Sequence, residues 1–342
     1  MAKLETKYLG LTLKNPLVVS ACPLTSDVDY LRRLEEAGAA AAVLPSLFEE
    51  QIEHEETELH RLFERQTESF AESLDYFPEM EDYNTGPDDY LHHIEAAKQV
   101  IGIPLIASLN GSSAGGWIRY ARLIEEAGAD ALELNIYIVP TDPNLTAHDV
   151  EQRYVELVAS VRESIKIPIA VKIGPYFSAL PNFARKLVEA GADGLVLFNR
   201  YLEPDIDLET LEIRPKLELS TRHEVRVPLR WIAILRDQLA TSLAATSGIH
   251  FADDVIKVLL AGADVAMIAS VLMRYGPSAL TKLQGELEYW LEEREYESVA
   301  QLRGSMSRAN CPNPANLDRS NYMHALINFT DKQELDQVVN RE

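Results

Sequence analysis

The sequence predicts an α/β protein folded as a (β/α)₈ (TIM) barrel, and two repeated patterns carry that prediction. Four near-copies of one string, each a helix end, a glycine and an apolar run, finish at Leu44, Leu134, Leu197 and Ile268. Short apolar runs of this kind are typical of parallel strands covered on both faces. Three further runs, NPLVVSA, IPLIASL and IPIAVKI, have proline as their second residue, and proline at the start of a strand costs no ladder bond. One strand-and-helix unit is therefore copied along the chain.

Taken in order, the units predict eight strands that alternate with eight amphipathic helices. The strands are expected near 16–21, 41–46, 104–109, 131–135, 168–173, 194–199, 242–246 and 264–269. The helices are expected near 27–37, 88–100, 114–127, 148–165, 178–190, 228–240, 251–261 and 276–293. The glycines that end four of these helices suit a left-handed backbone: Gly38, Gly128, Gly191 and Gly262. An open doubly wound sheet is less favoured, because the first strand runs into SACPLTSD without a glycine-rich turn.

Three segments lie outside the repeated units, and we expect all 342 residues to form one domain. The string ETKYLGLTLKN, ahead of the first strand, predicts an N-terminal hairpin that closes the barrel floor. Residues 49–89 form a long insertion after the second strand, on the side where such excursions cover active sites. Residues from about 294 to 342 predict a C-terminal extension packed on the outside of the barrel.

The charge of the chain excludes one class of function. The formal net charge is −22, whereas a nucleic-acid-binding protein needs a basic footprint. Residues 49–89 hold 15 acidic residues against Arg61 and Arg65, which favours a solvated flap over an acidic docking surface. No stretch is long and apolar enough to span a membrane, and no signal peptide is evident.

The cysteines and histidines indicate in which compartment the protein works and whether it binds a metal. The two cysteines, Cys22 and Cys311, suggest no disulfide framework, which fits a cytoplasmic protein. His54 and His60 are six residues apart, His92 and His93 are adjacent, and no HExxH pattern is present. We therefore expect no bound metal.

Polar residues stand at the carboxyl ends of four neighbouring strands, where barrel enzymes place their chemistry. They are Asn110, Asn135, Lys172 and Asn199, from the third, fourth, fifth and sixth strands. Any one of them could cap a helix or fix a loop. Four at equivalent positions favour a shared polar site, since a buried polar group needs a partner.

The seventh and eighth strands end in small residues that suit a phosphate site. Ser247-Gly248-Ile249 follows the seventh strand, and Ala269-Ser270 follows the eighth. The loops after these two strands recurrently bind phosphate in this fold, through backbone amides and a helix N-terminus. Ordinary tight turns remain the alternative. A phosphate beside a polar mouth predicts a phosphorylated cofactor or substrate.

These residues, taken together, resemble the dihydroorotate dehydrogenase family, the flavin-dependent barrels of pyrimidine biosynthesis. The matching strings are NPLVVSA, ELN at Asn135, VKIGPYF around Lys172, LFN at Asn199, SGI at 247–249 and IASVLMRYGPSAL from Ile268. The resemblance implies an FMN-dependent oxidoreductase acting on a CH–CH bond, with a small-molecule substrate that is dihydroorotate by default. It implies a phosphate held by Gly248, Ile249, Ala269 and Ser270, and leaves a homodimer open. The further cofactor-binding residues it implies are Ser20, Ala21, Ser46, Asn110, Asn135, Lys172, Asn199 and Ser247. Lys172 would face the N1/O2 edge of the flavin and stabilise the negative charge of the reduced ring.

The substrate half of the family pattern is altered in this chain. Family members carry a cysteine or serine after the fourth strand that takes the substrate proton, but here the string reads Asn135-Ile-Tyr-Ile-Val-Pro140. A family lysine after the second strand is replaced by Pro45, and Tyr83-Asn84-Thr85-Gly86 is a remnant of the orotate-binding asparagines. Tyr137 is the better candidate base of the two nearby hydroxyls, Tyr137 and Thr141, although packing of its aromatic ring over the mouth is the more common role for such a residue.

Two other functions remain open at this stage. A flavin-binding protein that has lost catalysis would account for the missing base. A carbon–carbon lyase could instead use Lys172 as a Schiff-base nucleophile on a sugar phosphate.

Overall fold

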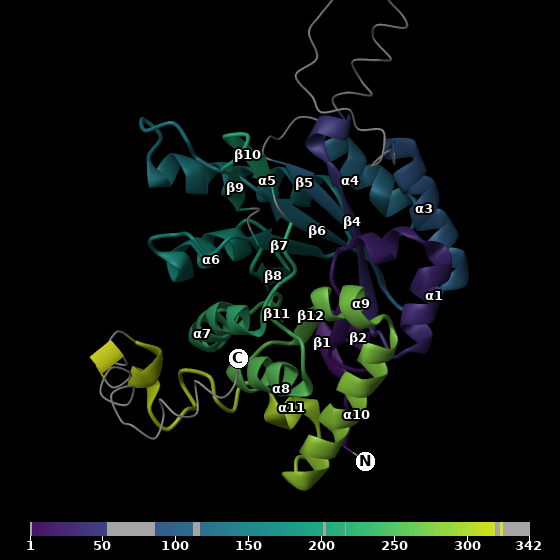
Figure 1. Cartoon of the computed structure of the whole chain (residues 1–342), viewed down its shortest axis with the longest axis vertical. Coiled ribbons are helices and arrows are strands. Elements are labelled where there is room, and N and C mark those ends of the chain that lie inside the picture. Colours follow the sequence, from purple (N-terminus) through teal and green to yellow (C-terminus); the bar gives the residue numbers. More distant parts are fainter. Residues whose placement is uncertain are drawn as a thin grey trace, which may run out of the picture.

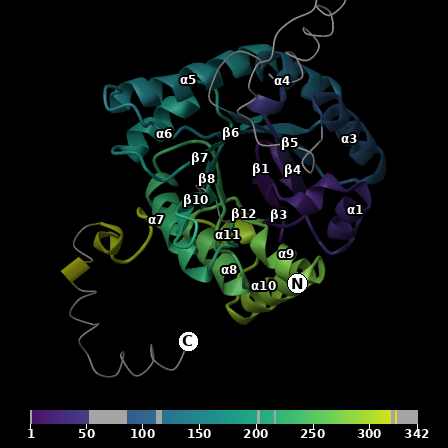
Figure 2. The same ribbon diagram turned by 45° about the horizontal axis from the view of Figure 1, so that its top comes forward.

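The computed structural model describes residues 2–52, 86–111, 117–200, 203–215, 217–318 and 322–323. Eight parallel strands close into a barrel in the order β11-β12-β3-β4-β5-β6-β7-β8, and helices surround them (Figure 1, Figure 2). The barrel strands are β3 (Leu17–Val19), β4 (Ala41–Phe48), β5 (Leu105–Gly111), β6 (Ala131–Ile136), β7 (Ile169–Ile173), β8 (Gly194–Leu197), β11 (Ser242–Ala245) and β12 (Val265–Ile268). The predicted (β/α)₈ barrel and the position of each of its strands are confirmed.

The predicted helices are also present, with small shifts in their ends. They are α1 (Val28–Glu36), α3 (Pro87–Val100), α4 (Trp117–Glu126), α5 (Ala147–Ser164), α6 (Leu180–Glu189), α7 (Arg226–Leu235), α8 (Ala252–Ala261) and α10 (Ser278–Glu293). Helix α7 ends five residues before its predicted end, in a turn where the Gln238 N–H donates to the Leu235 carbonyl (2.9 Å). A short helix that the sequence did not predict, α9 (Ser270–Tyr275), lies between β12 and α10.

Three of the four glycine strings contain an aspartate that connects neighbouring units. The four glycines have φ of +113°, +97°, +111° and +124°, as predicted for Gly38, Gly128, Gly191 and Gly262. In the last three copies, an aspartate two residues later accepts from an N–H at the start of the preceding barrel strand: Asp130 from Leu105 (2.7 Å), Asp193 from Ile169 (2.9 Å) and Asp264 from Leu243 (2.7 Å). Each aspartate also pairs with a cation: Lys98 (2.7 Å), Arg162 (3.0 Å) and Arg236 (3.1 Å), respectively. The first copy has Ala40 at this position.

The N-terminal hairpin lies against the amino ends of the barrel strands, the end called the floor here. Strands β1 (Thr6–Tyr8) and β2 (Leu11–Leu13) pair antiparallel, as predicted. Tyr8, Leu9 and Leu13 are buried among residues that face the barrel lumen: Val18, Ala41, Val43, Ile106, Ala131, Ala170, Val196, Ala244, Val265 and Met267. The hairpin therefore closes the lumen, and the small alanines leave space for the Tyr8 ring.

Because side chains alternate along a strand, every second residue faces the lumen, from the floor up to the mouth at the carboxyl ends of the strands. Residues two positions beyond the floor layer face the same lumen. Glu133 follows Ala131 in this way, and Lys172 follows Ala170. Two ionisable side chains are thus placed inside the barrel, with Glu133 opposite Ala170 and Lys172 two residues nearer the mouth.

A second hairpin that the sequence did not predict stands at the mouth. After β8 the chain forms β9 (Pro204–Asp207) and β10 (Glu212–Pro215), paired antiparallel, and returns through Leu217–Ser220 to the short helix η2 (Arg222–Val225). The long insertion after β4 begins with helical residues 49–52. Its residues 53–85, including Tyr83, Asn84, Thr85 and the histidines at 54 and 60, lie outside the described residues.

The C-terminal extension begins by returning to the floor. The Lys3 N–H donates to the Glu297 carbonyl (2.9 Å), and the Val299 N–H donates to the Lys3 carbonyl (2.9 Å). The short helices α11 (Val299–Leu302) and η3 (Pro314–Leu317) follow. Among the described residues, no helix is long and apolar enough to cross a membrane.

Candidate active site

A cavity of about 210 Å³ lies at the mouth, beneath the Leu217–Ser220 segment. Nine of the twelve predicted cofactor-binding residues line it: Ser20, Ala21, Lys172, Asn199, Ser247, Gly248, Ile249, Ala269 and Ser270. They come from the ends of five strands that are consecutive around the closed barrel, in the order β7-β8-β11-β12-β3. Barrel closure therefore brings the two predicted phosphate loops and Lys172 to one cavity.

The loop after β11 has two successive residues with positive φ and two buried amides. Ser247 and Gly248 have φ of +78° and +74°, and Gly248 and Ile249 are buried. No acceptor among the described residues engages the backbone N–H of Gly248 or Ile249. Buried amides normally have partners, so two free N–H groups beside a cavity suit an anionic ligand.

Ser270, the predicted phosphate ligand after β12, is hydrogen-bonded to the segment that covers the cavity. Its Oγ accepts from the Ser220 N–H (3.1 Å) and from Ser220 Oγ (2.8 Å). Ser220 Oγ also lies 3.2 Å from His250 Nε2. Burial, followed by the positive charge of Arg274, lowers the pKa of His250. Neither Ser220 nor His250 belongs to the site predicted from the sequence.

Lys172 extends from β7 to the base of the cavity and contacts a carboxylate, Glu133, that was not among the residues predicted from the sequence. Lys172 Nζ lies 3.3 Å from Glu133 Oε1, and the two side chains are 8% and 0% exposed. Glu133 Oε2 and Tyr8 Oη are buried without a hydrogen-bond partner among the described residues. The only ammonium at the described base of the cavity is thus half of a buried ion pair.

The other three predicted cofactor residues lie further round the mouth and do not line this cavity. Asn135 Oδ1 accepts from Asn199 Nδ2 (2.8 Å), so two of the predicted mouth amides meet. Asn110 lies beside Asn135 in the β5–β6 register. Ser46 Oγ is 2.8 Å from Ser108 Oγ. Their predicted contact with a flavin ring stays a prediction.

Tyr137 follows β6 directly and is half-buried. Its N–H donates to the Gly111 carbonyl (3.4 Å), which fixes the start of the loop. This backbone bond does not determine where the phenol of Tyr137 points. Tyr137 is not among the described residues that line the mouth cavity. Val139, two residues on, is 58% exposed. The role of Tyr137 as a base stays a prediction.

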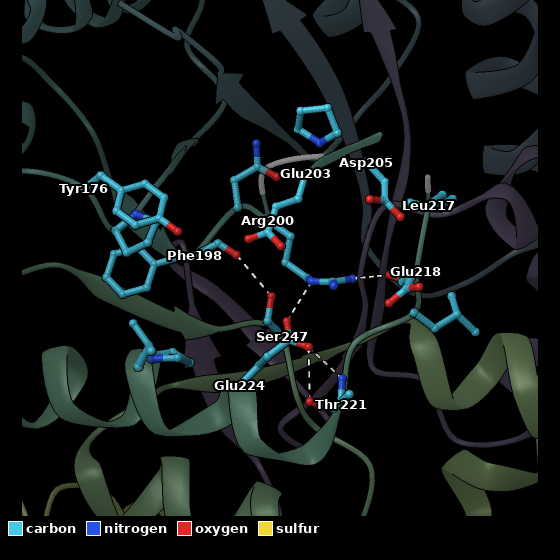
Figure 3. A pocket seen from close by; sticks show the side chains of 16 residues that line it. Tyr176, Phe198, Arg200, Glu203, Asp205, Leu217, Glu218, Thr221, Glu224 and Ser247 are labelled. Atoms are coloured by element: carbon cyan, nitrogen blue, oxygen red, sulfur yellow. Dashed lines mark hydrogen bonds and ion pairs between the residues drawn. The ribbon is translucent and has the colours of Figure 1, made fainter. Parts of the chain in front are cut away.

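A larger cavity, of about 660 Å³, adjoins the first (Figure 3). The two share the lining residues Phe198, Asn199, Arg200, Leu217, Glu218, Leu219 and Ser247. Arg200 extends into the centre of the larger cavity, where Nε lies 2.7 Å from Glu224 Oε2 and Nη1 donates to the Glu218 carbonyl (2.5 Å). Thr221 N–H in turn donates to Glu224 Oε1 (2.7 Å). These contacts fasten the return segment of the mouth hairpin to the barrel.

The two cysteines and one histidine of the adjacent pair have structural contacts. Both cysteines are free, and burial raises the pKa of the Cys22 thiol. His93 Nε2 lies 3.0 Å from the Thr25 carbonyl, so this ring fixes α3 to the loop after β3. No group of three or more histidine, cysteine, aspartate or glutamate side chains gathers as a metal site in the described part of the chain.

Comparison with known proteins agrees with the barrel and with the order of its loops. The "Dihydroorotate dehydrogenase" family model matches residues 3–291. Over 322 residues the chain is 24% identical to the "Dihydroorotate dehydrogenase B (NAD(+)), catalytic subunit" of Thermoplasma acidophilum, covering 89% of this chain and 99% of the relative. The protein of the same name from Listeria monocytogenes serotype 4b is 27% identical over 328 residues, covering 91% and 100%. A match that spans nearly the whole barrel shows that the chain belongs to the dihydroorotate dehydrogenase family.

Proposed function

We propose that this chain binds FMN across the barrel mouth and works as an oxidoreductase. The observation that carries the proposal is the cavity in which the loops after β11 and β12 meet Lys172. The residues present fit the cofactor: free buried amides at Gly248 and Ile249 suit its phosphate, and small residues at 269 and 270 leave space beside them. Family membership supports the same cofactor.

In this arrangement each part of the chain has a distinct task. Gly248, Ile249, Ala269 and Ser270 would hold the phosphate, and Lys172 would lie at the N1/O2 edge of the ring. FMN supplies the acceptor for hydride when it is bound. Lys172 supplies fixed positive charge where the reduced ring becomes negative, and charge held in a site sheltered from water stabilises such a product most effectively. Leu217–Ser220 would cover the phosphate end and exclude water from it.

The substrate we propose by default is dihydroorotate, oxidised at its CH–CH bond, and we expect the reaction to be slow. Ile138 and Val139 cannot take a proton, and Pro45 cannot bind the substrate carboxylate as a lysine would. Tyr137 is the hydroxyl we propose as the base. General-base catalysis typically contributes about 10²–10⁴-fold, so a poorly placed base lowers the rate by a comparable factor. A flavin-binding protein without catalysis is the second candidate, because the same loop lacks the family base.

Flavin binding is tested at Ala269, which adjoins the proposed phosphate. The wild-type chain should purify yellow, or take up about one equivalent of FMN with quenching of its fluorescence. Ala269→Asp should weaken FMN binding at least tenfold, since a carboxylate there repels the phosphate. Ala269→Asn has nearly the same shape without the charge and should bind FMN more tightly than Ala269→Asp. Equal affinities in the two variants would contradict this phosphate site.

The chemical step is tested by anaerobic stopped-flow bleaching of the bound flavin. Dithionite should bleach it readily, and dihydroorotate slowly. Tyr137→Phe should slow bleaching by dihydroorotate further and leave bleaching by dithionite unchanged. If dihydroorotate bleaches both proteins rapidly, the base is another residue. If it bleaches neither, the chain binds flavin without this activity.

A further inference from the structure

Glu133 is a buried carboxylate in the middle of the barrel lumen that the mechanism above does not use. It belongs to β6, opposite Ala170 of β7 in the parallel register, and it is fully buried. The lumen layer beneath it is apolar apart from the Tyr8 hydroxyl. Its one recorded hydrogen-bond partner among the described residues is Lys172, at 3.3 Å.

The surroundings of Glu133 make its interaction with Lys172 strong. Charges interact more strongly where water is excluded, and both side chains are less than a tenth exposed. A buried carboxylate without a partner is costly, so each charge depends on the other. The negative charge of Glu133 also reaches Tyr8 and Tyr90, whose pKa values are raised by burial first and by Glu133 second or third. The carboxylate thus acts on Tyr8 beneath it and on Tyr90 of α3 as well as on Lys172.

The Lys172–Glu133 pair is oriented with its positive end towards the mouth. Lys172 lines the mouth cavity, whereas Glu133 does not. The positive end of the pair therefore faces the proposed flavin, and the negative end lies below it, towards the floor. A flavin at the mouth meets a cation whose charge is partly cancelled from beneath.

We propose that Glu133 is a positioning residue that holds Lys172 at the mouth and sets how much positive charge the flavin ring meets. This inference rests on the proposed FMN site. Paired with Glu133, Lys172 favours the reduced, anionic ring less than a lone lysine would. Glu133 thereby keeps the reduction potential of the bound flavin lower than Lys172 alone would make it.

The flavin part of this proposal is tested with Glu133→Gln, which keeps the size of the side chain and removes its charge. The affinity for reduced FMN should rise at least tenfold relative to that for oxidised FMN. That ratio equals an increase of about 30 mV in the two-electron midpoint potential. Glu151→Gln is the matched control, because it removes a carboxylate from another lysine pair, Glu151–Lys186 (3.1 Å), on the outer helices. A midpoint potential that is unchanged or lower in Glu133→Gln, with FMN bound, overturns the proposal.

The positioning part is tested without flavin, by thermal unfolding of the apoprotein. Lys172→Met leaves the Glu133 carboxylate unpaired in the lumen and should lower Tm. Adding Glu133→Gln to Lys172→Met should raise Tm again, because the unpaired charge is gone. Strictly additive losses mean that Glu133 does not position Lys172. A wild-type chain that binds no FMN overturns the proposed function and the flavin part together, and this cycle still decides whether the two residues are coupled.

Discussion

Replacing Gly248 with alanine should destabilise the protein far more than the loss of a glycine alone explains. Gly248 has a φ of +74°, and a Cβ built on it would lie 2.3 Å from Val225 N and 3.0 Å from Thr221 O. Both neighbours are backbone atoms of the segment around η2, so no rotamer change relieves the overlap. Gly10 provides the matched control, because its φ is +77° and a Cβ there meets nothing within 4 Å.

The two substitutions share one cost and differ in the other. An alanine in the left-handed region costs about 1–2 kcal/mol, and both variants incur it. Overpacking against a rigid neighbour adds about 1–3 kcal/mol, and this applies to Gly248 alone. We therefore expect a loss of about 1–2 kcal/mol in the free energy of unfolding for Gly10→Ala and about 2–5 kcal/mol for Gly248→Ala.

Urea unfolding followed by circular dichroism measures both losses in the apoprotein. Equal losses would refute the inference that Gly248 packs against the η2 backbone. The same geometry bears on cofactor binding, since any residue larger than glycine must displace η2. A flavin-free Gly248 variant would consequently not by itself locate the phosphate, and Ala269 is the better position for that test.

Three further predictions concern the stability of the apoprotein. Burial lowers the pKa of His250 below its usual 6.5, so the unfolded chain binds a proton at this imidazole more readily than the folded protein does. The contribution of His250 to the free energy of unfolding is therefore highest above pH 6.5 and decreases as the pH falls below 6.5. His250→Gln should therefore show a smaller drop in urea midpoint between pH 8 and pH 5 than wild type, and an identical drop contradicts the assignment. Thr146→Ala should cost about 1 kcal/mol, because Thr146 and Asp149 form a capping box at the start of α5; Thr146→Ser, which keeps the hydroxyl, should restore most of the Tm. Asp264→Asn should lower Tm more than Asp193→Asn, because the Asp264 side chain is 5% exposed and that of Asp193 is 46% exposed, and the reverse order would show that burial does not set the strength of these clamps.

The barrel could be predicted from the sequence because its signal is local and repeated. A glycine at a positive φ and a proline at a strand start each depend on a few neighbouring residues. The order of the strands also predicted which loops would form the phosphate site, because the loops after the last two strands are neighbours in a closed barrel. The predicted residues Gly248, Ile249, Ala269 and Ser270 accordingly line one cavity.

Glu133 could have been identified from the same pattern. Ala131, Glu133 and Asn135 alternate along β6, so a glutamate two residues before a mouth asparagine must face the lumen. Its partner Lys172 was recognised, but the charge that balances it was not. Pairing of the two depends on the β6–β7 register, which local propensity does not specify.

Ser220, His250 and Arg200 lie beyond what the sequence pattern could reveal. Ser220 reaches Ser270 because the chain leaves β8, forms the β9–β10 hairpin and returns across the mouth. That path is set by contacts such as the Arg200–Glu224 ion pair (2.7 Å), which join residues with no periodic spacing. Tyr137 remains a prediction for a related reason, since the orientation of its ring depends on loop contacts.

The pairing of the first barrel strand with the last has a consequence for how the protein is made. Leu17 of β3 is hydrogen-bonded opposite Ala266 of β12, about 250 residues later. At a synthesis rate of about 5–20 residues per second, roughly 12–50 s pass between the emergence of these two strands from the ribosome. During that interval β3 presents one unpaired edge, a surface on which nascent chains can associate wrongly. The seam of the barrel is thus the place where a delay in translation, or a chaperone that shields a strand edge, would most affect the yield of folded protein.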